Sequence, residues 1–164
     1  MGRPTETGAE REALLRELAE MPAFLAGHLG AVRGAATRLP GSGGAFSPVE
    51  HCWHLAELER EGYGSRIERL LTEDEPHLAD FDGARLARER EYPTRSLSEG
   101  LDAFREARQA NLVRLRSLDA AQWSRAGSQE GVGEVRLGDL PRMMVEHDRA
   151  HKAEILAWLR EVGK

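Results

Sequence analysis

Apolar residues recur every three or four positions along four long stretches of this sequence, and that spacing constrains the fold more than any other feature. Such a pattern marks one face of a helix. The stretches cover residues 9–39, 47–71, 96–118 and 139–162. Aromatic residues make up only 5% of the chain, which suits a helical core better than a β sandwich. We therefore predict an all-α protein, a four-helix bundle with long crossover connections.

The second predicted helix has the clearest start. Ser47, Pro48 and Glu50 combine an N-cap serine, a proline in the first turn and a glutamate that can cap the backbone in return. A Pro-Gly-Ser-Gly-Gly turn at residues 40–44 separates this helix from the first one, in which Pro22 is expected to cause a bend.

The third and fourth helices have weaker start signals. Ser96 or Ser98 can cap the third, and Asp139 with Pro141 in the first turn can open the fourth. The connections at residues 77–97 and 120–136 look irregular, apart from one short helix expected near residues 83–90.

Length and charge narrow the class of protein. A chain of 164 residues fits one domain, so residues 1–164 are predicted to form a single helical-bundle domain with a flexible tail at residues 1–8. The net charge of -5 argues against a nucleic-acid partner. The one cysteine, Cys52, suits a reducing cytoplasm. The longest uncharged stretch of the first helix is about 12 residues, too short to cross a membrane.

Two histidines on the fourth predicted helix indicate a metal-binding site. His147 and His151 fall in the apolar row of that helix, four residues apart, where both rings can reach one metal ion. Burying two such rings without partners would cost about 1–3 kcal/mol each. We therefore favour a shared metal ion over two separate structural histidines.

Two other metal sites were weighed against this one. His147, Asp148 and His151 resemble the metalloprotease pattern, but Asp148 is one methylene shorter than the glutamate of that pattern. The chain also lacks the Glu-x-x-His pairs of helical di-iron proteins.

A third ligand has to come from another helix, and the second helix offers His51 and His54. A helical wheel does not separate them. Both lie away from the main apolar side, and both lie beside a second apolar row at Leu55 and Leu58. On spacing alone, either histidine can be the third ligand.

The sequence resembles the DinB/YfiT superfamily over nearly its whole length. The similarity rests on FSPVEHCWHLAE at residues 46–57 and, about ninety residues later, on LGDL at 137–140 and HDRAHKAEI at 147–155. Matched position by position, it implies His54, His147 and His151 as metal ligands and leaves His51 as a polar neighbour. Phe46 stands where the family usually has tryptophan, and Pro141 where it usually has leucine.

The resemblance also implies a function. It predicts a divalent metal, nickel or zinc, in an open three-histidine site, commonly in a homodimer. The family's activities imply a thiol-dependent S-transferase acting on a small-molecule substrate with a low-molecular-weight thiol. The alternatives are a metal-dependent hydrolase of small substrates and a non-catalytic dimeric stress or binding protein.

Several other residues have open roles. Glu57 and Glu154 each follow a proposed ligand by three residues and could hold its ring, or they could be solvated carboxylates. Arg105 and Arg108 could receive a substrate carboxylate, although a solvated helix face is the commoner explanation. Cys52 is expected to be a small core side chain rather than a nucleophile.

Overall fold

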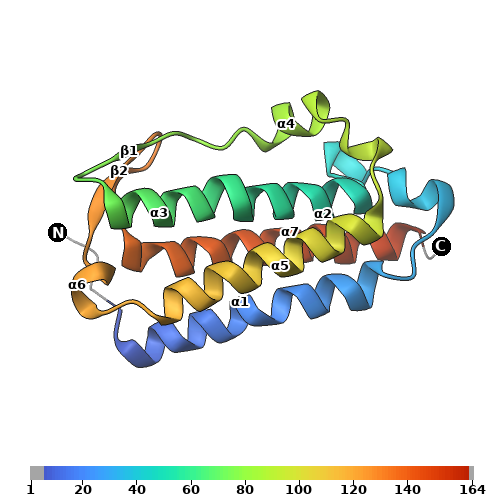
Figure 1. The fold of residues 1–164 in the computed structure, drawn as a ribbon. Coiled ribbons are helices and arrows are strands. Elements are labelled where there is room, and N and C mark those ends of the chain that lie inside the picture. Colours follow the sequence, from blue (N-terminus) through green and yellow to red (C-terminus); the bar gives the residue numbers. More distant parts are fainter. Residues whose placement is uncertain (1–5, 163–164) are drawn as a thin grey trace.

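The structure is a computed structural model that describes residues 6–162, and four long helical rods lie side by side in it (Figure 1). The first rod is α1 (Gly8–Leu29). The second is a continuous run of α2 (Pro48–Glu57), a π-helical segment (Leu58–Tyr63) and α3 (Gly64–Thr72). The third is α5 (Leu97–Arg116) and the fourth is α7 (Leu140–Val162). The predicted helical bundle is therefore confirmed.

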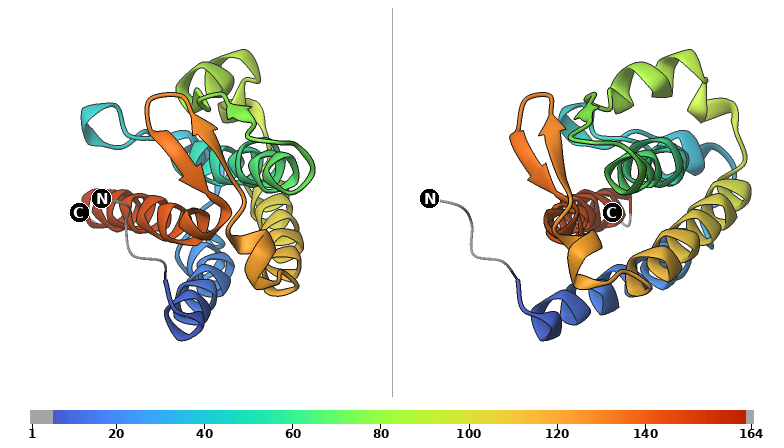
Figure 2. Two further views of the ribbon diagram at one scale, coloured as in Figure 1. Left: turned by 90° about the vertical axis from the view of Figure 1, so that its left-hand side faces the viewer. Right: turned by 60° about the vertical axis from the view of Figure 1, so that its left-hand side comes forward.

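The rods follow an up, down, down, up order. In Figure 1, α1 and α7 run in one direction, while α2 with α3 and α5 run in the other. Both views in Figure 2 place α1 beside α5, and α2 with α3 between α5 and α7. Because α3 and α5 run the same way, the chain has to return along the whole bundle between them, and residues 73–96 form this crossover.

Helix caps explain most of the boundaries. Thr7, Ser47 and Ser96 each accept a hydrogen bond from the third backbone N–H of the helix that they precede. The predicted starts at Ser47 and Ser96 are confirmed. Because Thr7 caps α1, the helix begins at Gly8, inside the predicted tail; residues 1–5 of that tail lie outside the described residues.

The first helix ends earlier than its apolar pattern predicts. It ends at Leu29, and a short 3₁₀ turn, Gly34–Arg38, replaces the predicted continuation to residue 39. The backbone is already extended at Arg33, with a φ of -135° and a ψ of 158°, and Gly34 follows with a left-handed φ of 61°, so α1 cannot continue through these residues. Pro22 lies within α1 and does not end it.

The connections hold more regular structure than the sequence indicates. The crossover contains α4 (Gly83–Glu89), close to the short helix predicted there, and β1 (His77–Leu78). The stretch predicted to be irregular forms α6 (Ala120–Trp123) and a hairpin of β2 (Ala126–Gln129) and β3 (Gly133–Arg136). β2 pairs with β3 in antiparallel and with β1 in parallel orientation. These strands are too short for a period-two pattern to show in the sequence.

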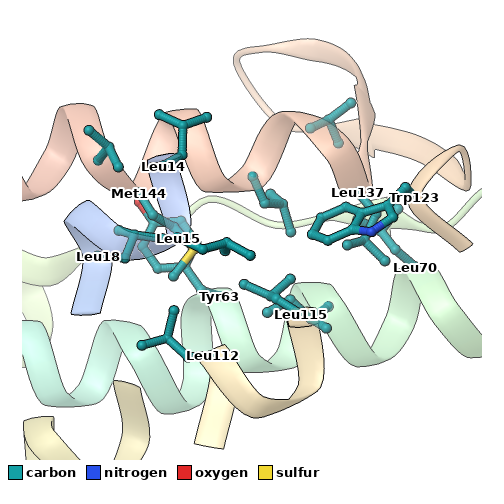
Figure 3. Close-up of a cluster of buried hydrophobic side chains, with 14 of the residues drawn as sticks. Leu14, Leu15, Leu18, Tyr63, Leu70, Leu112, Leu115, Trp123, Leu137 and Met144 are labelled. Atoms are coloured by element: carbon teal, nitrogen blue, oxygen red, sulfur yellow. The ribbon is translucent and has the colours of Figure 1, made fainter. Parts of the chain in front are cut away.

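The core consists of two apolar clusters at different levels of the bundle. Figure 3 shows the first cluster, which includes Leu14, Leu15, Leu18, Tyr63, Leu70, Leu112, Leu115, Trp123, Leu137 and Met144. The second includes Met21, Leu25, Leu29, Val49, Cys52, Leu55, Phe104 and Ile155. No helix among residues 6–162 is both long enough and apolar enough to cross a membrane.

A buried polar layer separates the two clusters. We define it as Glu59, Arg108, Asn111 and Asp148, all of which are buried. On α5, Arg108 lies between Phe104 of the second cluster and Leu112 of the first. The layer therefore crosses the bundle at the level where one cluster gives way to the other.

Arg108 links four elements through this layer. Its Nη1 donates to Asp148 Oδ2 at 2.7 Å and to the Leu18 carbonyl at 2.9 Å, and its Nη2 donates to Asp148 Oδ1 at 2.9 Å and to Glu59 Oε1 at 2.6 Å. Asn111 donates to the remaining Glu59 oxygen, Oε2, at 2.8 Å. The guanidinium thus joins α1, the π-helical segment and α7 to α5.

Replacing Arg108 by methionine should destabilise the fold strongly. R108M leaves two carboxylates buried without their cation, and we expect the free energy of unfolding to fall by about 3–5 kcal/mol. Urea titration followed by tryptophan fluorescence measures the change. R105M is the matched control, because Arg105 is an exposed arginine on the same helix, and it should change stability by no more than about 0.5 kcal/mol. Equal effects of the two variants would contradict the role given to Arg108.

Candidate metal centre

Three histidines from two antiparallel helices converge beside the polar layer. His54 lies on α2, and His147 and His151 lie one turn apart on α7. His54 Nε2 lies 3.4 Å from His147 Nε2, which lies 3.2 Å from His151 Nε2. The three rings offer ligand atoms that are all within 4.8 Å of one another.

These distances fit a metal ion. Two nitrogens that each lie about 2.0–2.1 Å from one tetrahedral cation are about 3.3 Å apart, close to the 3.2 and 3.4 Å between the Nε2 atoms. With three protein ligands, a tetrahedral cation keeps one position for water or substrate. His54, His147 and His151 are therefore the candidate ligands.

Burial keeps these imidazoles neutral. Burial, together with a smaller effect of neighbouring histidines, lowers the pKa of His151 to about 2 and that of His54 to about 3. Burial also lowers the pKa of His147. A neutral imidazole has a lone pair to give to a cation, so the rings need lose no proton to bind a metal at neutral pH.

Aromatic side chains surround the candidate ligands. The Phe46 ring lies nearly parallel to that of His151, at a centroid distance of 6.4 Å, and 5.2 Å from that of His54. Phe81 lies 6.1 Å from His54, and Tyr63 presents an edge to His147 at 6.4 Å. These apolar walls lower the local dielectric and so strengthen electrostatic interactions within the site.

The polar layer adds charge next to the ligands. Asp148 follows His147 on α7, and the layer sets one guanidinium against the carboxylates of Asp148 and Glu59. The guanidinium of Arg66, which is also buried, acts on His147 as well, so two arginines offset the two carboxylates beside the candidate ligands.

His54 and His151 are held in place by different kinds of contact. Gly83 of α4 lies against His54 so closely that a Cβ at this position would overlap the ring at Cε1 and Nδ1. His54 Nδ1 is buried and has no hydrogen-bond partner among residues 6–162. His151 Nδ1 instead lies 2.9 Å from Nδ1 of His51, which is buried as well. Packing thus positions His54, whereas a hydrogen bond positions His151.

Glu57 takes neither of the two roles that the sequence left open to it, because it is buried and lies away from the ring nitrogens. Its carboxylate forms ion pairs with Arg90 and Arg95 of the crossover and makes no contact with His54 Nδ1. Glu154 does lie near the rings, with Oε2 3.7 Å from His51 Nε2 and 3.9 Å from His151 Nδ1.

The two arginines proposed for substrate binding are engaged elsewhere. Both Nη atoms of Arg108 are taken by Asp148 and Glu59, so it is neither a substrate anchor nor part of a solvated face. Arg105 is exposed and pairs with Asp102. Cys52 is buried in the second cluster, where burial raises the pKa of its thiol to about 12, in agreement with the predicted core role.

Sequence reasoning missed three contributors to this region. Gly83 gives no signal in the sequence, because its contact with His54 arises from the crossover. Glu59 and Asp148 meet only through Arg108. The buried role of that arginine could have been inferred, since it stands four residues from both Phe104 and Leu112 within one apolar row.

Comparisons with known proteins agree with the fold. The structure is similar to that described as "YfiT from Bacillus subtilis is a probable metal-dependent hydrolase with an unusual four-helix bundle topology", with a TM-score of 0.90 and 21% sequence identity over 99% of this chain and 93% of that one. No curated protein matches the sequence. The sequence model of the DinB superfamily matches residues 6–155. This chain therefore belongs to the DinB superfamily.

Proposed function

We propose that this protein is a metalloenzyme that binds one divalent cation through His54, His147 and His151 and activates a small nucleophile there. The observation that carries the proposal is the convergence of neutral Nε2 atoms at 3.2 and 3.4 Å. Three nitrogen ligands suit zinc or nickel.

When bound, the cation supplies Lewis acidity, which lowers the pKa of a coordinated water toward about 7 and removes the proton of a coordinated thiol. The residues around the candidate site determine which small molecules can reach the cation. Phe46, Tyr63 and Phe81 offer apolar contacts to a small substrate and limit access of bulk water. His147 is the least buried of the three candidate ligands, which places the open side of the site near it.

The carboxylates near the site favour a thiol as the nucleophile. Glu59 and Asp148 are paired with Arg108, and Glu57 is paired with Arg90 and Arg95, so these three are not free to act as a general base. Coordination to a cation would lower the pKa of a thiol far enough for its proton to pass to solvent, without such a base. This supports the thiol-dependent S-transferase that the family resemblance implies.

Hydrolysis is the second candidate function. It is favoured by the description of the structurally similar YfiT as a probable metal-dependent hydrolase. In this chain, Glu154 is half-exposed near the rings of His51 and His151, and it is the carboxylate best placed to assist a water.

Alanine at each candidate ligand should abolish tight metal binding. Wild-type protein purified without an affinity tag should bind one equivalent of Zn²⁺ or Ni²⁺, whereas H54A, H147A and H151A should each lose more than the roughly 10- to 100-fold in affinity that loss of an outer-shell partner costs. Isothermal titration and elemental analysis measure this. H28A, which removes an exposed histidine of α1, is the control. Full binding by H54A would exclude that ligand.

Thiol and water chemistry can be separated with cobalt-substituted protein. If a thiol is the nucleophile, cysteine or glutathione should change the visible Co²⁺ spectrum, and the protein should speed thiol addition to 1-chloro-2,4-dinitrobenzene. H147A should lose both effects. Hydrolysis of 4-nitrophenyl acetate without any thiol response would instead support the hydrolase. Unfolding on chelation, with neither response, would indicate a structural ion and contradict both.

Enlarging Gly83 should weaken metal binding without unfolding the protein. In G83A the new Cβ displaces the His54 ring from its position, so we expect roughly a tenfold or greater loss of Zn²⁺ affinity with a nearly unchanged helical circular-dichroism spectrum. G27A is the control, since a Cβ at Gly27 meets nothing within 4 Å. Equal Zn²⁺ affinity in G83A and wild type would show that α4 does not position His54.

A further inference from the structure

His51 is buried beside the candidate metal centre, but it is not one of the three proposed ligands. Its Nδ1 lies 2.9 Å from Nδ1 of His151, and the two rings meet edge to face at 87°. Its Nε2 is buried and has no hydrogen-bond partner among residues 6–162. The nearby carboxylate is that of Glu154, whose Oε2 is 3.7 Å from this nitrogen. The same oxygen lies 3.9 Å from Nδ1 of His151, so the carboxylate lies beside both imidazoles, and His151 lies between His51 and the candidate metal position.

The proton between the two Nδ1 atoms can occupy either ring, and the choice has consequences. A neutral imidazole carries one proton on one of its two nitrogens. If His151 donates from Nδ1, its Nε2 has a free lone pair directed toward His147, and His51 must carry its own proton on Nε2, toward Glu154. If His51 donates instead, the Nε2 of His151 is protonated and cannot bind a cation, and the bare Nε2 of His51 faces a carboxylate, which places two acceptors together.

The first arrangement leaves no two acceptors facing each other and directs the Nε2–H of His51 toward the charge of Glu154. We propose that His51 is a positioning residue, which accepts a hydrogen bond from Nδ1 of His151 and thereby holds that ligand in the tautomer and orientation that present Nε2 to the metal. Glu154 stabilises the required Nε2–H tautomer of His51. This inference rests on the proposed function for its biological purpose, but the tautomers themselves exist without a metal.

A second cation between His51, His151 and Glu154 is the competing interpretation, because these side chains also offer ligand atoms within 4.8 Å of one another. The geometry favours the hydrogen bond. A separation of 2.9 Å is an ordinary hydrogen-bond length, whereas two nitrogens on one tetrahedral ion are about 3.3 Å apart. Two cations would also require His151 to use both ring nitrogens and to lose its remaining proton.

The tautomers can be read directly in the full-length protein by long-range ¹H–¹⁵N NMR of the histidine rings. In metal-free protein we expect His151 to carry its proton on Nδ1 and His51 to carry its proton on Nε2. Zn²⁺ should leave both tautomers unchanged and shift the Nε2 resonance of His151. The reverse pair of tautomers in metal-free protein would overturn the proposal, as would binding of a second Zn²⁺ equivalent with loss of the Nδ1 proton of His151.

Variants of His51 separate positioning from packing. H51L keeps the bulk but removes the acceptor, and should weaken Zn²⁺ binding by roughly 10- to 100-fold. H51N puts a carbonyl oxygen near the former Nδ1 and should restore affinity to within about threefold of wild type, with His151 again protonated on Nδ1. If H51L binds Zn²⁺ as tightly as wild type, or if H51N binds as weakly as a folded H51L, His51 acts only as packing and the proposal fails.

Substitution of Glu154 tests whether its carboxylate stabilises the Nε2–H tautomer of His51. E154Q removes the charge that favours the Nε2–H tautomer of His51, so the minor tautomer should become detectable by NMR and Zn²⁺ affinity should fall severalfold. E146Q, at an exposed carboxylate on the same helix, is the matched control and should change neither. Identical spectra for E154Q and wild type would remove Glu154 from the proposal.

Failure of this inference is distinguishable from failure of the proposed function. If wild-type protein binds no divalent cation but shows the expected tautomers, the metalloenzyme proposal fails, whereas the proposed hydrogen bond from His151 to His51 is supported. If wild-type protein binds one cation tightly and H51L binds it equally well, the metal centre stands and the role of His51 is wrong.

Discussion

The buried ion pairs of Arg108 are the interaction on which this structure depends. A guanidinium in the middle of a helical bundle needs its charge matched and its N–H groups bonded. Here two carboxylates from different rods and one backbone carbonyl match the charge and bond both Nη atoms, and the Nε atom has no partner among residues 6–162. Because hydrogen bonds tolerate little error in distance, the layer allows little sliding of α5, α7 and the π-helical segment past one another. Apolar contacts alone would specify this register less sharply.

The same layer places the candidate ligands. Asp148 is bonded to Arg108, and its neighbour His147 is therefore presented at the same level of the bundle, toward α2. Beside this layer the histidines contribute neutral donors. A divalent cation would thus meet three lone pairs where water is largely excluded. The stability of the bundle and the chemistry of the site share one set of residues.

Part of the candidate metal centre could be predicted from the sequence, and physical reasons explain why the rest could not. His147 and His151 were recognisable because both ligands lie on one helix, where a four-residue step fixes their relative position. The choice between His51 and His54 could not be made from helical spacing, because α2 contacts more than one neighbouring helix and both rings are buried. A helical wheel describes one helix and contains no information on which neighbour each side meets. Family resemblance pointed to His54, and the structure gives His51 a separate place behind His151.

The first and last residues of the helices and strands could likewise be predicted where local interactions determine them, but not where tertiary contacts do. Ser47 and Ser96 were correct starts because a cap is a local interaction of a few residues. The end of α1 was wrong because the apolar pattern continues beyond the point where Gly34 adopts a left-handed conformation. The strands of residues 126–136 escaped notice because they are defined by pairing with each other and with β1, and pairing partners far apart in sequence leave little local trace.

The order of the helices explains why the long crossover belongs to the site. Parallel neighbours cannot be joined by a tight turn, so the chain must return along the bundle between α3 and α5. On this return path it places Gly83 against His54 and directs Arg90 and Arg95 to Glu57. The crossover therefore fixes one ligand by contact and removes one carboxylate from the reach of the imidazoles. Changes in this connection could alter the shape and charge of the site while the Arg108 layer keeps the four rods in place.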